Sequence, residues 1–324
     1  MNVLDDYRHE HLTLTEDQAK ALSYCREPGY TIEVHPPVNK SVPKKLDLLI
    51  QGIQEIQSKW LGLVNVSPLI SFEIRRVAGE LHYQFSVPTK RLERKLRNHL
   101  ANQVDGIGFS DGYNGLPVAA RSEIGGGFLT AGRNDYFPFQ TEFDSPPANA
   151  LASTLHKHAM QNTDVVIQIL FQPVIGHPVK RRWWRKKAYR QIGFLKKEKE
   201  KLWGRRAPTR REKRQAQSIE GKAGSNRFYT SIRFIVVGAG EYTPSRVKEL
   251  VGAFNVYENP ETGQYLNLET LKPLREKPLF QFCNAAANRE YGNWGYSFQT
   301  TVDELSGLVS IPSRQQDNIQ FSQA

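Results

Sequence analysis

Apolar and polar positions along the chain predict the same succession of elements twice. The first copy begins with residues 69–76 and 81–87, two runs rich in β-branched and aromatic residues that predict a β-hairpin. A helix is predicted after Pro88, because apolar residues then recur at helical spacing, at Leu92, Leu96 and Leu100. The first copy is therefore strand, strand, helix.

The second copy begins at residues 164–174, whose apolar run is typical of a buried strand, and continues with the β-rich run 227–238. Pro244 then opens a helix whose apolar residues share one stripe: Val247, Leu250, Val251 and Phe254. Two such units can build a single sheet. We predict an α+β fold with a mixed or antiparallel sheet and helices packed on one face.

Three regions are predicted along the chain. Residues 1–66 form a helical N-terminal preface, with one helix over 41–60 where apolar residues recur at helical spacing. Residues 67–258 form the α+β core, which a basic arm over 176–224 interrupts. Residues 259–324 are predicted to be an irregular C-terminal extension.

One short helix is predicted inside this extension, over residues 300–308. Thr301 suits its N-cap, and Glu304 three residues later completes a capping box.

Positive charge is concentrated between the two strands of the second copy. Residues 180–222 hold 18 of the 44 Lys and Arg residues and four of the 33 acidic residues, a net charge of +14. The other 281 residues carry 26 basic and 29 acidic residues, a net charge of −3. The chain is thus a near-neutral body with one basic arm, placed at the tip of a predicted hairpin. We expect the body to fold without the arm.

Cations interleaved with tryptophans suit a polyanion, because arginine forks bind phosphate oxygens and indole rings stack on exposed bases. The predicted nucleic-acid contacts are Lys180, Arg181, Arg182, Trp183, Trp184, Arg185, Lys186, Lys187, Arg190, Arg205, Arg206, Arg210 and Arg211. An anionic membrane surface would attract the same cations and tryptophans. A solvated arm or a protein partner also fits this composition, and the sequence does not separate these alternatives.

The chain lacks the motifs of familiar catalytic sites. A P-loop needs a Gly-Lys pair followed by Ser or Thr, but Gly221 and Lys222 are followed by Ala223. Two His-x-His pairs are present, at His9/His11 and His156/His158. A nicking enzyme needs both imidazoles on one side of a strand, whereas the second pair is predicted in a helix, where such residues point apart. We predict no catalytic residue, no metal site and no cofactor, and keep a DNA nicking or replication-initiator enzyme of a mobile element as an alternative.

Cysteine usage and hydropathy indicate the compartment. Cys25 and Cys283 lie far apart and suggest neither a disulfide framework nor a thiolate metal site, which favours a reducing environment. The N-terminus is polar and acidic, unlike a signal peptide, and no apolar run approaches the ~18 residues of a membrane-spanning helix. We expect a cytoplasmic protein, whose contact with a membrane, if any, is peripheral.

Three segments carry a resemblance to a known family. Residues 61–100, with Val87-Pro88 at a turn before a helix, the buried strand 164–174 and the segment 304–313 are similar to parts of one protein region. That region is the N-terminal, non-ATPase part of conjugative DNA-transfer (type IV secretion) ATPases. The resemblance covers about residues 60–310.

The resemblance implies a non-catalytic role. In that family a motor domain with a P-loop follows, whereas this sequence stops at Ala324. We therefore expect a front half without its motor: a non-catalytic subunit of a DNA-transfer or DNA-packaging apparatus. Its expected partners are nucleic acid, foremost DNA, a P-loop ATPase in trans and further copies of itself. The alternatives are the nicking enzyme and a membrane-peripheral scaffold.

Overall fold

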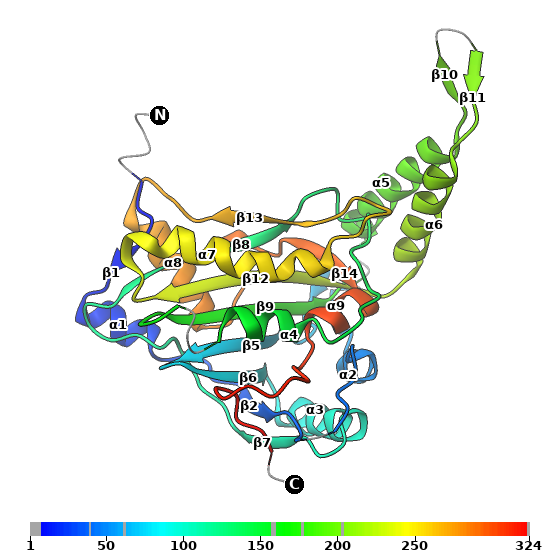
Figure 1. The fold of residues 1–324 in the computed structure, drawn as a ribbon. Coiled ribbons are helices and arrows are strands. Elements are labelled where there is room, and N and C mark those ends of the chain that lie inside the picture. Colours follow the sequence, from blue (N-terminus) through cyan, green and yellow to red (C-terminus); the bar gives the residue numbers. More distant parts are fainter. Residues whose placement is uncertain are drawn as a thin grey trace.

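The structure is a computed structural model, which describes residues 8–38, 40–60, 63–156, 160–175, 178–201 and 204–322. A large antiparallel sheet organises the body (Figure 1). Its strands follow the order β1 (Leu12–Thr13), β8 (Glu123–Ala131), β12 (Arg227–Val237), β9 (Asp164–Pro173), β5 (Ile70–Val77), β6 (Glu80–Val87), β2 (Tyr30–His35) and β7 (Gly108–Asp111). Two more strands extend the sheet: β13 (Leu266–Thr270) pairs with β8, and β14 (Phe298–Thr301) pairs with β12.

Both predicted strand-strand-helix units are present. β5 and β6 form a hairpin that leads into α3 (Lys90–Gln103). β9 and β12 pair antiparallel, and α7 (Thr243–Gly252) follows β12. The units join in the middle of the sheet, where β5 pairs with β9. The predicted α+β fold is confirmed, and the sheet is of the antiparallel kind.

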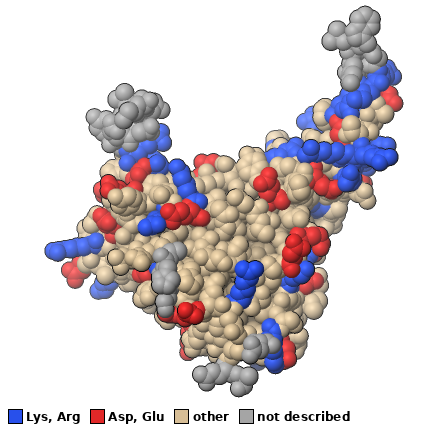
Figure 2. All heavy atoms as spheres, viewed as in Figure 1, with Lys and Arg blue, Asp and Glu red and all other residues tan. Residues whose placement is uncertain are grey.

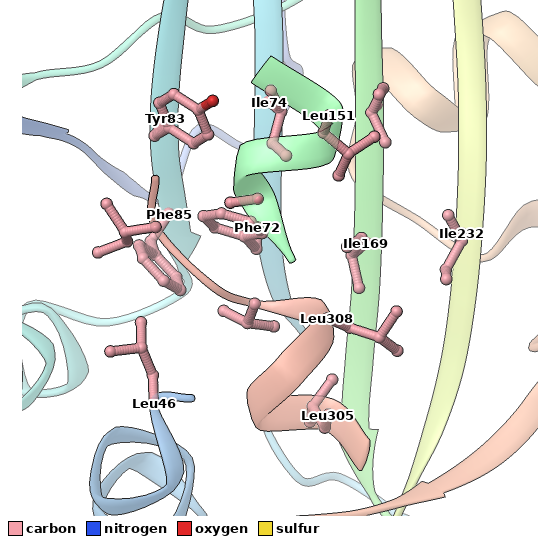
Figure 3. Close-up of a cluster of buried hydrophobic side chains, with 14 of the residues drawn as sticks. Leu46, Phe72, Ile74, Tyr83, Phe85, Leu151, Ile169, Ile232, Leu305 and Leu308 are labelled. Atoms are coloured by element: carbon pink, nitrogen blue, oxygen red, sulfur yellow. The ribbon is translucent and has the colours of Figure 1, made fainter. Parts of the chain in front are cut away.

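One face of the sheet carries the main apolar core (Figure 3). Because side chains alternate along a strand, Phe72 and Ile74 of β5 and Ile169 of β9 all point to this face. Leu151 and Leu308 reach the same core from the helices above it. Those helices are α2 (Asp47–Ile53), α3, α4 (Ala148–Thr154), α7 and α9 (Val302–Leu308).

A second helical layer covers part of the opposite face, beyond the single face that the sequence predicted. It consists of α1 (Glu16–Leu22) and α8 (Glu276–Ala287). Leu279 and Phe282 of α8 pack with Val166 and Ile235 of the strands. The apolar residues of α8 do recur at helical spacing, but Pro278 hides the pattern; it is tolerated because it lies in the first turn of the helix.

The two terminal regions contribute to the sheet, which corrects their predicted roles. The preface, 1–66, supplies β2 between β6 and β7. Its predicted helix over 41–60 shortens to α2, because the apolar residues beyond Ile53 do not pack: Ile56 and Trp60 are exposed. A small hairpin, β3 (Ser58–Lys59) and β4 (Val64–Asn65), follows instead.

The C-terminal extension, predicted to be irregular, contains β13, α8, β14 and α9. The helix predicted over 300–308 is confirmed as α9. Thr301 accepts a hydrogen bond from the backbone of Glu304, and the Glu304 side chain accepts one from the backbone of Thr301.

A buried carboxylate, Glu73 of β5, ties four elements together on the second face. It accepts hydrogen bonds from Arg289 after α8 (2.8 Å), Gln168 of β9 (2.8 Å), Gln84 of β6 (2.6 Å) and Arg75 of β5 (3.3 Å). Burial by itself would raise the pKa of Glu73, but Arg289 and Arg75 outweigh burial and hold this pKa below its ordinary range. Glu73 is therefore the counter-ion of two buried arginines.

Replacing Glu73 with Gln should lower the free energy of unfolding by about 3–5 kcal/mol, because both arginines are left without their buried counter-ion. Urea unfolding at neutral pH measures the loss. Glu80→Gln, on the exposed end of β6, is the control and should change stability by less than about 0.5 kcal/mol. Equal midpoints for the two variants would contradict the role of Glu73.

Wild type and Glu73→Gln should also differ in how their stability depends on pH. The folded-state pKa of Glu73 is lowered, so the stability that its charge supplies is complete above the ordinary value of 4.5. This stability is lost as the pH falls towards the lowered pKa. The difference in unfolding free energy between wild type and Glu73→Gln, measured by urea unfolding, should therefore shrink below about pH 4.

Candidate nucleic-acid interface

The basic arm is a helical hairpin that projects from the end of the β9–β12 hairpin (Figure 1). It runs through α5 (Pro178–Lys196), β10 (Lys199–Lys201), β11 (Gly204–Arg206) and α6 (Arg210–Gly224). Residues at helical spacing join the helices: Ala188, Ile192 and Leu195 of α5 pack with Ala216, Ile219 and Ala223 of α6. The predicted insertion at a hairpin tip is thus confirmed, and the insertion has a small core of its own.

Glu212 organises the outer part of the arm. Its carboxylate completes a capping box with Thr209 at the start of α6. It also accepts a hydrogen bond from Arg206 at 2.9 Å and binds Lys199, one cation from each strand of the tip hairpin. These hydrogen bonds, that of Arg206 first, lower the pKa of Glu212 below its ordinary range.

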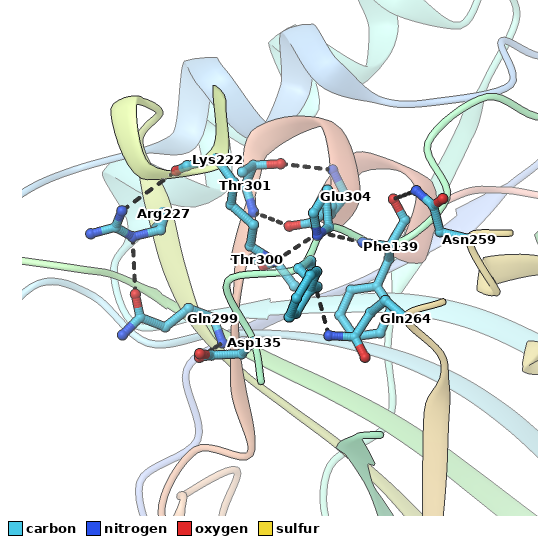
Figure 4. A network of polar contacts seen from close by, with 12 residues as sticks. Asp135, Phe139, Lys222, Arg227, Asn259, Gln264, Gln299, Thr300, Thr301 and Glu304 are labelled. Atoms are coloured by element: carbon cyan, nitrogen blue, oxygen red, sulfur yellow. Dashed lines mark hydrogen bonds and ion pairs between the residues drawn. The ribbon is translucent and has the colours of Figure 1, made fainter. Parts of the chain in front are cut away.

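The root of the arm is fixed to the body by a buried ion pair (Figure 4). Lys222 of α6 donates to Glu304 of α9 at 2.8 Å, and both side chains are 1% exposed. The backbone N–H of Phe139 donates to the same carboxylate oxygen at 2.8 Å. Because a buried carboxylate without its cation is costly, this pair holds α6 in one position against α9.

A second set of contacts fixes Trp184 of α5. The guanidinium of Arg227 lies over the indole ring, 3.9 Å from its centroid, and donates to Gln299 at 3.0 Å. The indole N–H of Trp184 donates to Asp135 at 2.7 Å, and Asp135 also accepts the backbone N–H of Gln299. Trp184 therefore joins the arm to β12 and β14.

These interactions correct the expectation that the body folds without the arm. Removing 180–222 would delete Lys222 and leave Glu304 buried without its cation. It would also uncover Tyr136 and Phe137 of the body, which pack with the arm's own core. The arm is part of the body's packing, and its charge has to be tested by substitution.

The predicted contact residues fall into four groups in the structure. Exposed side chains are those of Trp183, Lys186, Lys187, Arg190, Arg205 and Arg210. Trp184, Arg185 and Arg206 are half-buried. Arg211 is bound to the body, because it donates to the carbonyl oxygens of Pro260 and Glu261. The side chains of Lys180, Arg181 and Arg182 lie outside the described residues.

An exposed stripe of aromatic and cationic side chains follows α5. Trp183, Lys187, Arg190 and Phe194 recur at intervals of four, three and four residues, which places them on one side of the helix. The ammonium group of Lys187 lies 4.6 Å from the ring centroid of Trp183. Trp183 is 63% exposed and Phe194 is 59% exposed. The stripe therefore offers rings and charges to the same ligand.

A cavity of about 420 Å³ opens where this stripe meets the body. Arg227 and Tyr229 come from β12, Gln299 from β14 and Tyr296 from the loop before β14, while Trp183, Trp184 and Lys187 come from α5. The rings of Tyr229 and Tyr296 are 4.2 Å apart at a 36° angle. Burial raises the pKa of both tyrosines, so their hydroxyl groups are neutral at physiological pH.

Sequence reasoning missed the body's half of this cavity. Tyr229, Tyr296 and Gln299 are far from residue 183 along the chain and carry no unusual charge or spacing. Antiparallel pairing of β12 with β14, which sets Tyr229 opposite Gln299, brings them beside the arm. A pairing between segments some 70 residues apart leaves no local signal for the cavity.

Other candidate chemistry finds no support in the described residues. No group of three His, Cys, Asp or Glu residues among them could hold a metal ion. His156 follows α4, and its predicted partner His158 lies outside the described residues. Both cysteines are free and buried, and burial raises the pKa of Cys283 to about 12.

The helices in the described ranges also bear on contact with a membrane. None of them is both long enough and apolar enough to cross a bilayer.

Replacing Lys222 with Ala should cost about 3–5 kcal/mol of unfolding free energy, because Glu304 stays buried without its cation. Urea unfolding measures the loss. Lys213→Ala removes an exposed lysine from the same helix and should change stability by less than about 0.5 kcal/mol. If Lys222→Ala unfolded at the same urea concentration as Lys213→Ala, the arm would not be anchored as described.

Comparison with known proteins places the chain in a family. No curated protein matches it. A family model described as "Domain of unknown function (DUF8128)" matches residues 4–324, nearly the whole chain. The chain therefore belongs to the DUF8128 family.

Proposed function

We propose that this protein is a non-catalytic, nucleic-acid-binding subunit of a DNA-transfer or DNA-packaging apparatus, and that the basic arm contacts phosphate groups. The observation that carries the proposal is where the charge lies. Figure 2 shows Lys and Arg side chains gathered on the projecting arm, whereas the body carries both signs interspersed. A projection whose net charge is strongly positive can reach along a polyanion that the body does not touch.

The acids of the arm leave much of its charge available. Glu212 and Glu220 pair with Lys199, Arg206 and Lys196. Among the predicted contact residues whose side chains the structure describes, four exposed cations form no ion pair, side-chain hydrogen bond or ring contact: Lys186, Arg190, Arg205 and Arg210. These four are the side chains best placed to displace counter-ions from phosphates, which is the main source of such affinity.

The remainder of the proposal rests on the resemblance to conjugative ATPases. That resemblance supports a separate P-loop ATPase as the partner that hydrolyses nucleotide in trans. Two free, buried cysteines are compatible with action in the reducing cytoplasm.

A quadruple variant with Lys186, Arg190, Arg205 and Arg210 changed to Ala should bind DNA more weakly and with less salt dependence. Each phosphate that the variant leaves unneutralised flattens the slope of log K against log salt by about 0.9 for duplex and about 0.7 for single strands. The slope should therefore change by up to about 3.6 for duplex. Fluorescence anisotropy across a salt series measures it.

The matched control changes four exposed cations of the body to Ala: Lys20, Lys90, Arg94 and Lys248. Its net charge equals that of the arm variant, so a general charge effect would weaken both proteins alike and contradict the proposal. Flotation with phosphatidylserine vesicles tests the lipid alternative. If the arm cations governed vesicle binding but not DNA binding, the nucleic-acid function would be wrong.

A further inference from the structure

We propose that the cavity at the root of the arm binds one unpaired nucleobase, so that the protein prefers single-stranded to double-stranded nucleic acid. This inference rests on the proposed function, because it takes the strand to be held along the arm by its phosphates. It assigns a ligand to the cavity, which the charge of the arm alone does not identify.

The lining of the cavity suits a flat aromatic ring. Trp183 and Tyr296 keep 63% and 43% of their surface exposed although they line it. Tyr229 stacks against Tyr296 and stiffens that wall. A volume of about 420 Å³ falls in the ~300–1,000 Å³ range of small-ligand pockets. Rings on α5 and on the loop before β14 can therefore meet the faces of an inserted base.

The polar groups at the cavity suit the edge of a base. Asn134, which lines the cavity and is exposed, offers an amide donor and acceptor. Gln299 and Asp135 also line the cavity, where their side chains accept hydrogen bonds from Arg227 and Trp184. A base inside a duplex has its faces covered by stacking and its edge paired, so it cannot use these groups. The cavity thus favours a base that is already unpaired.

Charge next to the cavity suits the phosphate that accompanies such a base. Lys187 lines the cavity and lies against Trp183, and Lys186 and Arg190 lie within one turn of Lys187 along α5. A single nucleic-acid strand whose base enters the cavity can then run along the exposed stripe of α5. Rings for bases beside cations for phosphates are the combination found in proteins that bind single strands.

The structure also gives Trp183 and Trp184 different roles, although the sequence predicted both as nucleic-acid contacts. One face of Trp184 is covered by Arg227, its edge contacts Tyr136, and its N–H is bonded to Asp135. Trp184 is therefore a positioning residue that holds the wall of the cavity. Trp183 is the tryptophan that can stack on a base.

The test compares Trp183→Leu and Tyr296→Leu with two controls. Leucine keeps apolar bulk but removes the π-system. Trp183→Phe restores a ring, and Tyr189→Leu removes a 52% exposed aromatic from the same helix without touching the cavity. Anisotropy is measured with labelled single-stranded DNA and RNA of about 20 nucleotides and with the corresponding DNA duplex. Each Leu variant at the cavity should bind single strands about 5- to 100-fold more weakly, with duplex binding unchanged.

The outcomes separate this inference from the proposed function. Weaker binding of single-stranded DNA or RNA by Trp183→Leu and Tyr296→Leu, with both controls near wild type, supports the base pocket. Whichever of the two single strands loses more affinity is the nucleic acid that the pocket prefers. Unchanged binding, or an equal loss with duplex, overturns the pocket but leaves the proposed function standing if the arm-cation variant is still weak. If that variant binds every probe like wild type, the proposed function itself fails.

Discussion

The buried pair between Lys222 and Glu304 fixes how the charged part of this protein meets its folded body. Glu304 caps α9, accepts the backbone N–H of Phe139 and neutralises Lys222, so one carboxylate joins three separate segments. Such a pair constrains geometry more than it adds stability, since desolvation cancels much of the attraction. Its effect is to hold α6 in a single orientation, and α6 carries α5 with it through their shared apolar core.

A rigid arm changes what its charge can do. Cations on a loose loop would bind any polyanion, whereas cations on a fixed helical hairpin present one stripe beside one cavity. Trp184 shows the arrangement most clearly: its interactions with Arg227 and Asp135 bring α5 against the edge of the sheet. Trp183, the next residue back, then faces the space between the arm and Tyr296. The anchor of the arm and the proposed base contact thus fall on adjacent residues of one helix.

Much of the fold followed from local patterns. The strands and helices of the two strand-strand-helix units and the capping box of α9 were predicted, because each has a pattern within a few neighbouring residues. The pairing of β9 with β12 across the arm followed from the repeated order of elements, not from local sequence. The places of β2, β13 and α8 were not predicted. β2 enters the sheet through pairing with β6, about 50 residues away, and α8 packs on the second face although Pro278 interrupts its pattern. Long-range pairing leaves little trace in local sequence.

The sequence by itself determined where the charge lies and which elements flank it. Composition shows that residues 180–222 are basic whatever they fold into, and periodicity shows that strands precede and follow them. Tertiary structure decided which of those side chains are available. It buried Lys222 against Glu304, covered Trp184 with Arg227, and left Trp183, Lys186 and Arg190 exposed. The physical reason is that availability depends on neighbours brought from β12, β14 and α9, and those neighbours are set by packing rather than by sequence distance.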